Sequence, residues 1–287
     1  MNYSWKEFIR KLYQRTYFGK VQKKITLLEL KSEEYRSLEN PVFIVSTGRC
    51  RTHWLTNIIA DQKDVFVNHS PDIPFLKEGK LYYDYFEQQT EYEPFYTQLF
   101  FTARDKILLE CAKRNLQYVE TNNRITFALP VIKDKIYNSR FVHITRNPFD
   151  FIISGINRNW FEGDGHDLGR ITMHDTFEWN KLNTIQKIGW LWFESNNFIL
   201  KNTLDLKSDR YFFSKSEDLN TAVLRKIFIF AGIKELKISS KWTSTKTNFQ
   251  TKSKSLDKLE ILKALQDTSF NKEFFDLCDQ FGYNLKD

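Results

Sequence analysis

The feature that most restricts the fold is an apolar run that turns into an amphipathic helix. Residues 42–45 read VFIV, an apolar and mostly β-branched run bounded by Pro41 and Ser46. Such a run is typical of a strand buried on both faces of a parallel sheet. Helical spacing of the next apolar residues predicts a helix from about Thr52; these residues are Trp54, Leu55, Ile58 and Ile59. The chain therefore forms a strand, a polar turn and a helix in succession.

The polar turn, residues 46–53, is named here the anion turn. Backbone N–H groups and the positive end of a helix dipole meet at such a point, and Arg49, Arg51 and His53 surround it. The alternative is an ordinary turn with solvated arginines. A Walker turn would read G-x-x-x-x-G-K-[ST]. The anion turn lacks that lysine and the second glycine, which favours a phosphorylated ligand other than a magnesium-bound nucleoside triphosphate and disfavours a P-loop kinase.

A second unit further along the chain repeats the pattern. Residues Phe141 to Thr145 predict a strand, Arg146 to Pro148 a polar turn, and the helix that follows has Phe151, Ile152 and Ile156 on its apolar face. Other strands are expected at Val65–Val67, in QYVE (117–120) and in RYFFS (210–214), with helices between them, including a helical insertion from about residue 81 to 115.

This alternation predicts an α/β fold in which helices flank a central parallel sheet. In such folds ligands bind beyond the carboxyl ends of the strands, where His69, Glu120, Arg146 and the anion turn are expected to lie. A basic loop, SSKWTSTKTNFQTKSKS (239–255), could close over an anionic ligand.

Two segments carry a family resemblance. STGRCRTHWL resembles the 5′-phosphosulfate loop, and FVHITRNPFDFIISG the 3′-phosphate element, of sulfotransferases that use 3′-phosphoadenosine 5′-phosphosulfate (PAPS). The resemblance spans roughly Pro41 to Ser255 and implies the P-loop-like architecture of that family. It also implies that PAPS contacts Gly48, Arg49, Cys50, Arg51, Thr52, His53, Arg146, Ser154, Lys246, Asn248 and Lys252.

The chain departs from the family pattern at several positions. Where the loop commonly reads Arg-Ser-Gly-Thr-Thr, Arg51 occupies the glycine position and His53 that of the second threonine. Glu120 stands where some members have lysine, and Ser216 where members often have tyrosine. Cys50 could be a reactive thiol, but we expect it to fill the turn as a small side chain.

The resemblance implies sulfuryl transfer without a metal, and an acceptor hydroxyl on a carbohydrate or glycolipid. Arg49 is then expected to stabilise the leaving 5′-phosphate. His69 is the expected general base, since its imidazole titrates near neutrality and it ends a strand expected beside the one that feeds the anion turn. A structural histidine is the alternative. Glu120 is the second candidate base, unless it merely pairs with an arginine such as Arg124.

Charge and cysteine content limit the partners and the compartment. The 43 Lys and Arg residues exceed the 36 Asp and Glu residues, for a net charge of +7, which favours polyanionic ligands. Without zinc-finger spacing or an aromatic RNA-binding signature, nucleic acid is not expected. The 3 cysteines are far apart and odd in number, which indicates a reducing, cytoplasmic location.

We expect one domain over residues 41–287, preceded by a basic amphipathic segment over 1–40. That segment packs on the domain in the favoured interpretation, and could instead touch a membrane surface. A loop rich in acidic residues and histidines could hold a metal, although its glycine-broken spacing favours a flexible wall of the acceptor cleft; it contains Asp164, His166, Asp167, His174 and Asp175. A non-catalytic module that binds nucleotides or polyanions is the remaining alternative.

Overall fold

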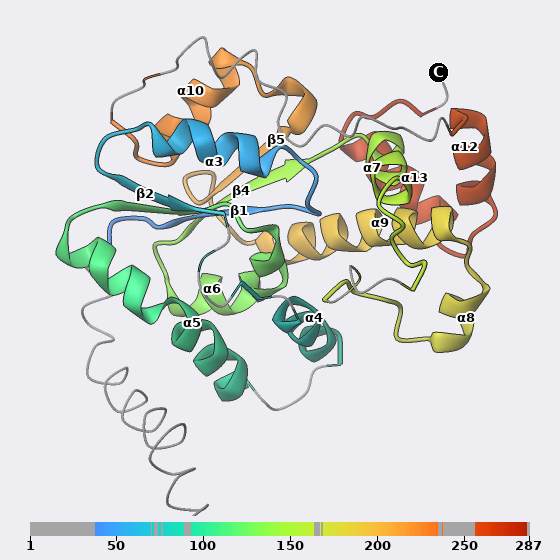
Figure 1. Ribbon diagram of the computed structural model, residues 1–287, viewed down its shortest axis with the longest axis horizontal. Helices are drawn as coiled ribbons and strands as arrows, with labels where there is room; N and C mark the ends of the chain where they lie inside the picture. Colours follow the sequence, from blue (N-terminus) through green and yellow to red (C-terminus); the bar gives the residue numbers. More distant parts are fainter. Residues whose placement is uncertain are drawn as a thin grey trace, which may run out of the picture.

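The protein is built on a parallel five-stranded sheet. The computed structural model describes residues 38–69, 71, 74–75, 77–88, 93–163, 167, 169–234, 237 and 256–285. The sheet order is β2-β3-β1-β4-β5, and every neighbouring pair is parallel. The strands are β1 (Val42–Val45), β2 (Val65–Asn68), β3 (Gln117–Glu120), β4 (Arg140–Thr145) and β5 (Tyr211–Lys215). The predicted α/β fold with a central parallel sheet is confirmed (Figure 1).

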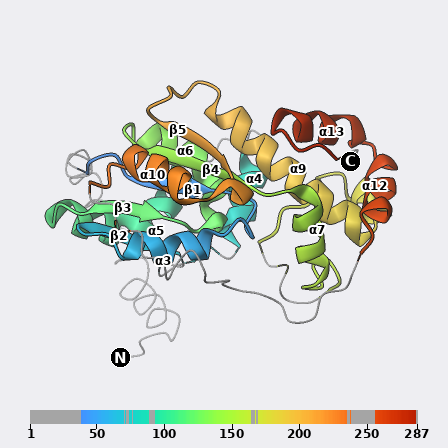
Figure 2. The same ribbon diagram turned by 90° about the horizontal axis from the view of Figure 1, so that it is seen from above.

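Helices cover both faces of the sheet (Figure 1). On one side lie α3 (Thr52–Ala60) and α10 (Thr221–Phe230). The other side carries α5 (Glu93–Lys113), α6 (Leu129–Lys135) and α9 (Thr184–Thr203). The remaining elements are α4 (Glu78–Gln88), η2 (Asn123–Ala128), α7 (Pro148–Ile156), α8 (Thr176–Lys181), η4 (Ser216–Asp218), α12 (Lys258–Gln266) and α13 (Asn271–Gln280). Figure 2 shows α7, α12 and α13 gathered at one end of the sheet.

Alternation along β1 divides the core into two clusters. Val42 and Ile44 pack with residues of α3 and α10, whereas Phe43 and Val45 pack with residues of α5, α6 and α9. All four side chains of β1 are buried, because successive residues of a central strand face opposite helical layers. The apolar run that opened the sequence analysis is therefore the centre of the fold.

The order of the strands corrects one expectation. We expected the strand that ends before His69 to lie beside β1, but β3 lies between β2 and β1. The reason is that the chain passes through the helical insertion, α4 and α5, before it returns as β3 to the inner position. His69 nevertheless stays close to the anion turn, because α3 packs against β2.

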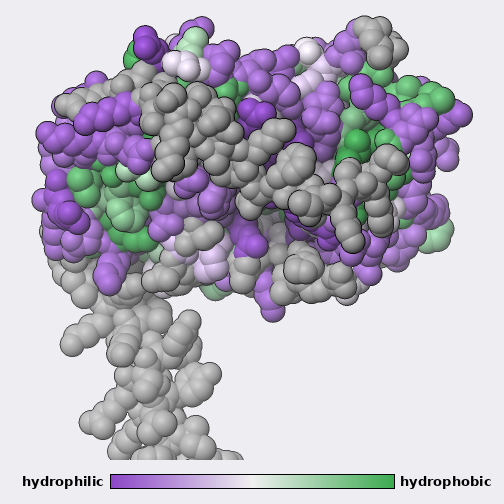
Figure 3. All heavy atoms as spheres, turned by 45° about the horizontal axis from the view of Figure 1, so that its top comes forward, coloured by the Kyte–Doolittle hydropathy of each residue, from purple (hydrophilic) through white to green (hydrophobic). Residues whose placement is uncertain are grey.

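The face of the molecule in Figure 3 is mainly polar where it is coloured. Hydrophilic side chains cover most of the coloured surface in Figure 3, with smaller apolar patches between them. Exposed large apolar side chains such as Phe177, Leu204 and Ile229 belong to different parts of the chain, as is ordinary for protein surfaces. Among the described helices, none combines the length and apolar character that crossing a bilayer demands. The segment 1–37 lies outside the described residues.

Candidate active site

The anion turn, which follows β1, contains residues in the left-handed backbone conformation. Gly48, Arg49 and Arg51 have φ angles of 82°, 59° and 59°. The backbone N–H of Gly48 donates to Ser46 Oγ at 3.1 Å, and a Cβ added at Gly48 would lie 2.9 Å from Asn123 Nδ2. Position 48 therefore suits glycine both by its backbone conformation and by its close neighbour.

The thiol of Cys50 fills the interior of this turn. Its side chain is fully buried, and its Sγ atom lies 3.0 Å from the carbonyl oxygen of Gly48 and 3.4 Å from Thr47 Oγ1. Burial raises the pKa of the Cys50 thiol to about 12. A thiol held protonated in this way is a packing group rather than a nucleophile.

Helix α3 begins at the end of the turn with its N-terminus turned to the site. Thr52 is buried in its first turn, whereas Arg51 and His53 are exposed. Within the described residues of α3, the N-cap makes no side-chain capping bond and the first turn holds no acidic residue. The positive end of the helix dipole is thus left for an external anion.

The second unit brings Ser154 to the anion turn. Asn147 caps α7, its side chain accepting from the N–H groups of Phe149 and Asp150 at 3.0 and 3.4 Å. Arg49 Nε donates to Ser154 Oγ at 3.3 Å, and Arg146 donates to the carbonyl oxygen of Arg49 at 3.1 Å. The two expected anion elements therefore meet, with Arg49 as the link between Arg146 and Ser154.

A third arginine, Arg158, joins this group. Its Nη1 atom donates to the carbonyl oxygen and to the Oγ atom of Ser154, at 2.9 Å each. The sequence analysis did not identify Arg158, although its position four residues after Ser154 places both on one face of α7 and its continuation. We name Arg49, Arg146, Arg158 and Ser154 the arginine cluster.

The arginine cluster holds more positive charge than its surroundings balance. Burial, followed by the charges of Arg158 and Arg146, lowers the pKa of Arg49 to about 10. Burial and then Arg146 also lower the pKa of Arg158. Within the described residues, two exposed acidic side chains lie nearby. Asp150 Oδ2 is 3.9 Å from Arg146 Nη2, and Glu217 accepts from the backbone N–H of the residue after Arg146 at 2.8 Å. Guanidinium groups packed together in this way are suited to bind an anion.

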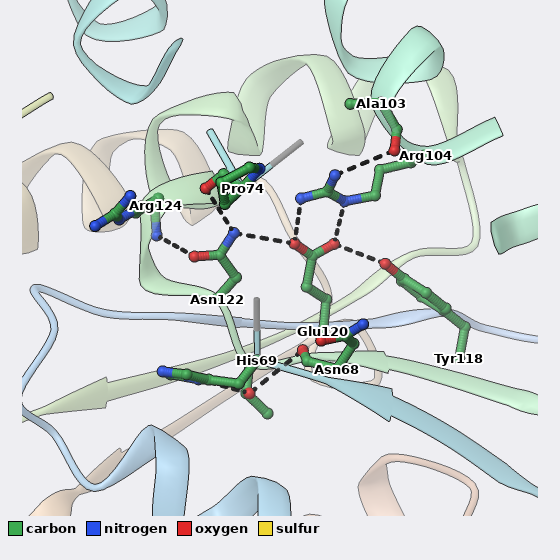
Figure 4. A network of polar contacts seen from close by, with 10 residues as sticks. Asn68, His69, Pro74, Ala103, Arg104, Tyr118, Glu120, Asn122 and Arg124 are labelled. Carbon is green, nitrogen blue, oxygen red and sulfur yellow. Dashed lines mark hydrogen bonds and ion pairs between the residues drawn. The ribbon is translucent and has the colours of Figure 1, made fainter. Parts of the chain in front are cut away.

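His69 lies where β2 ends, next to the first turn of α3. Its Nδ1 atom is 3.1 Å from Thr121 Oγ1 (Figure 4). That oxygen is 2.6 Å from Thr56 Oγ1. The rings of His69 and His53 meet edge to face with their centroids 5.3 Å apart. Burial, followed by the charge of His53, lowers the pKa of His69. A neutral imidazole is thus held beside the anion turn.

Glu120 faces the opposite side and is already paired. Its carboxylate accepts two hydrogen bonds from Arg104, at 2.7 and 2.8 Å, and one from Tyr118 Oη at 2.7 Å (Figure 4). The side chains of Glu120 and Arg104 are fully buried. The ion pair is therefore with Arg104 and not with Arg124, and His69 is the better placed of the two candidate bases.

The described residues of the acidic and histidine-rich loop have other partners. Asp167 pairs with Arg170 at 3.1 Å, Asp175 caps α8, and His174 stacks on Tyr83 with ring centroids 5.4 Å apart. No group of three or more possible metal ligands occurs in the described part of the chain. Asp164 and His166, together with Lys246, Asn248 and Lys252 of the basic loop, lie outside the described residues.

Known structures share this architecture. A sulfotransferase domain from the Synechococcus PCC 7002 olefin synthase gives a TM-score of 0.50 at 16% identity, over 86% of this chain and 96% of that domain. A sulfotransferase from Alicyclobacillus acidocaldarius gives 0.50 at 12% identity, over 86% of this chain and 98% of its own. The chain has a sulfotransferase fold. No protein-family model matches the sequence, and no curated protein is significantly similar to it.

The backbone of the anion turn bears on one departure of this chain from the family pattern. Arg51 occupies a position where the family pattern has glycine, and its φ of 59° lies in the left-handed region. An arginine therefore adopts a backbone conformation that suits glycine better. The consequence is a further cation beside the first turn of α3.

Proposed function

We propose that the protein is an enzyme that transfers a sulfuryl group from PAPS to an acceptor hydroxyl on a carbohydrate or glycolipid. The observation that carries this proposal is the arginine cluster, in which Arg49 and Arg158 donate to the hydroxyl of Ser154 and Arg146 donates to the carbonyl oxygen of Arg49. The fold shared with sulfotransferases supports the same class of reaction. The lowered pKa values of Arg49 and Arg158 fit a site that is suited to a ligand with several phosphates.

Different parts of the site would hold different parts of the nucleotide. Arg49 and the first turn of α3 are placed for the 5′-phosphate, because both sit at the end of β1. Arg146 and Ser154, with Arg158 beside them, are placed for the 3′-phosphate. PAPS would supply the activated sulfur–oxygen bond.

The proposed transfer is a single in-line displacement. His69 takes the proton of the acceptor hydroxyl as that oxygen forms its bond to sulfur. The bond between sulfur and the 5′-phosphate oxygen breaks, and its electron pair stays on the phosphate, where Arg49 and the dipole of α3 stabilise the charge. Thr121 holds the imidazole by its Nδ1 atom throughout. The products are a sulfate ester, 3′,5′-ADP and protonated His69.

Ligand-dependent thermal unfolding tests the nucleotide class. We expect 3′,5′-ADP to raise the melting temperature more than ATP with magnesium does, since Arg146, Arg158 and Ser154 would bind a 3′-phosphate. A ligand at 100 times its dissociation constant adds about 2.7 kcal/mol of stability, which is a measurable shift. Equal shifts from the two nucleotides would reject the proposed donor.

Two variants separate binding from turnover. Arg146→Ala should weaken binding of 3′,5′-ADP, because a bidentate contact to phosphate is lost. Arg49→Ala should reduce sulfuryl transfer more than binding, because its charge meets negative charge that grows on the leaving phosphate. Arg225→Ala on the exposed face of α10 is the matched control, and calorimetry with 3′,5′-ADP is the measurement.

A further inference from the structure

Arg124 lies on the same side of the site as His69. Thr121, which contacts His69 Nδ1 at 3.1 Å, directly follows β3, and Arg124 lies in the first turn of the next element, η2. Figure 4 shows the side chains of Arg124 and His69 extending to one side, away from the pair formed by Glu120 and Arg104. A guanidinium and the proposed base therefore face the same region.

The main chain of Arg124 is held at its N–H and lies close to α4 at its carbonyl oxygen. Its N–H donates to Asn122 Oδ1 at 3.1 Å, and Asn122 Nδ2 in turn lies 3.4 Å from Glu120 Oε1 and from the carbonyl oxygen of Pro74. A Cβ added to Gly79 of α4 would lie 2.9 Å from the carbonyl oxygen of Arg124. The buried network and α4 thus support the backbone from which this side chain extends. Residues that bind a ligand require such a supported backbone.

Within the part of the chain that the structure describes, the guanidinium of Arg124 takes part in no ion pair. Glu78 raises the pKa of Arg124, but burial lowers it more strongly. The carboxylate near His69 is that of Glu120, and Arg104 already pairs with it. Positive charge beside the proposed base is therefore left uncompensated.

We infer that the acceptor carries an anionic group near the hydroxyl that is sulfated, and that Arg124 binds this group beside His69. The inference rests on the proposed function and narrows its acceptor to one with a carboxylate, sulfate or phosphate ester. A rigidly presented guanidinium recognises such groups through paired hydrogen bonds, which would also fix the direction of the hydroxyl. An arginine that is merely solvated would show no such selectivity.

A matched pair of sugars tests the inference. p-Nitrophenyl β-D-glucuronide and p-nitrophenyl β-D-glucoside differ by a carboxylate in place of a hydroxymethyl group. The rate of 3′,5′-ADP release from PAPS is measured at increasing concentrations of each sugar. A sugar that acts as an acceptor speeds this release, and one that competes with water slows it. The half-effect concentration of each sugar is compared. We expect the half-effect concentration of the glucuronide to be lower than that of the glucoside by about tenfold or more. That ratio is the scale of a hydrogen bond to a charged group.

Three variants locate the selectivity. Arg124→Gln should abolish the difference between the two sugars, and Arg124→Lys should retain part of it because the charge remains. Arg114→Gln removes the same charge from the exposed chain that precedes β3, at the opposite end of that strand, and should leave the difference intact. Calorimetry with 3′,5′-ADP on each variant reports the state of the nucleotide half of the site.

The outcomes of these experiments separate a failure of the inference from a failure of the proposed function. Equal half-effect concentrations for the two sugars in the wild type, or no effect of either, would overturn the inference and leave the proposed function standing. A loss of 3′,5′-ADP binding in Arg124→Gln, with the sugar difference retained, would place Arg124 on the nucleotide and also overturn it. A wild-type protein that neither binds nor releases 3′,5′-ADP would reject the proposed function itself.

Discussion

The Nε atom of Arg49 donates a hydrogen bond of 3.3 Å to the Oγ atom of Ser154, a residue 105 positions further along the chain. Arg49 follows β1 and Ser154 lies in α7, which follows β4, and β1 and β4 are neighbours in the sheet. Neighbouring parallel strands end at the same edge, so the turns that follow them meet there. This contact joins the 5′ and 3′ halves of the proposed nucleotide site.

The first prediction concerns Arg158. Arg158→Gln should raise the dissociation constant of 3′,5′-ADP by about tenfold or more, since a hydrogen bond to a charged group contributes about 1.5–3 kcal/mol. Arg225→Gln removes the same charge from an exposed position on α10 and should change the affinity little. Isothermal titration calorimetry compares the two. Equal affinities in both variants would limit Arg158 to holding Ser154 in place.

Local sequence patterns were enough to predict the strands. The apolar runs at Val42–Val45 and Phe141–Thr145 became β1 and most of β4, and the helix expected from Thr52 begins there. These elements could be predicted because burial on both faces of a parallel sheet demands continuous apolar residues.

Relationships between elements could not be predicted in the same way. Nothing in the apolar run before His69 indicates that β3 would lie between β2 and β1. Arg104 belongs to a long helix, and its pairing with Glu120 depends on how α5 packs against β3. The role of Arg158 became visible only when the anion turn was placed beside α7. Such contacts depend on tertiary packing, which periodicity alone does not determine.

A second prediction concerns the buried ion pair. Glu120→Gln should lower the free energy of unfolding by about 3–5 kcal/mol, because Arg104 would remain buried without a counter-charge. The double variant Glu120→Leu with Arg104→Met should lose far less, since it removes both charges. Urea unfolding measures each variant. If the folded double variant retains sulfuryl transfer, Glu120 is structural; an inactive but stable double variant would return Glu120 to consideration as the base.

A third prediction concerns the left-handed residue that precedes α3. Arg51→Gly should raise the free energy of unfolding by up to about 1 kcal/mol, because a side chain at a φ of 59° costs about 1–2 kcal/mol, partly offset by the greater freedom of glycine in the unfolded chain. Arg51→Val should be destabilising, since a β-branched residue avoids this region. Thermal unfolding without ligand measures both. A less stable Arg51→Gly variant would show that the arginine side chain makes a larger favourable contribution than the strain removes.

The last prediction is the pH dependence that His69 imposes. Its pKa lies below the usual 6.5, because of burial and then the charge of His53, so the neutral imidazole acts as the base down to a pH below 6.5. We therefore expect kcat/KM for sulfuryl transfer to be flat near neutrality and to fall on the acid side, with a midpoint below pH 6.5. Because the unfolded state binds the proton more readily, the stability from neutral His69 is complete above pH 6.5 and is lost as the pH falls toward the folded pKa.

Two variants connect this acid limb to His69. His53→Gln removes the neighbouring charge, so the pKa of His69 should rise and the limb should move to higher pH. His69→Ala should reduce transfer by about 10²-fold or more, the scale of a positioned general base, and abolish the limb. Unfolding curves at each pH separate inactivation from loss of structure. A His69→Ala enzyme that keeps both the rate and the limb would place the proton acceptor on another residue.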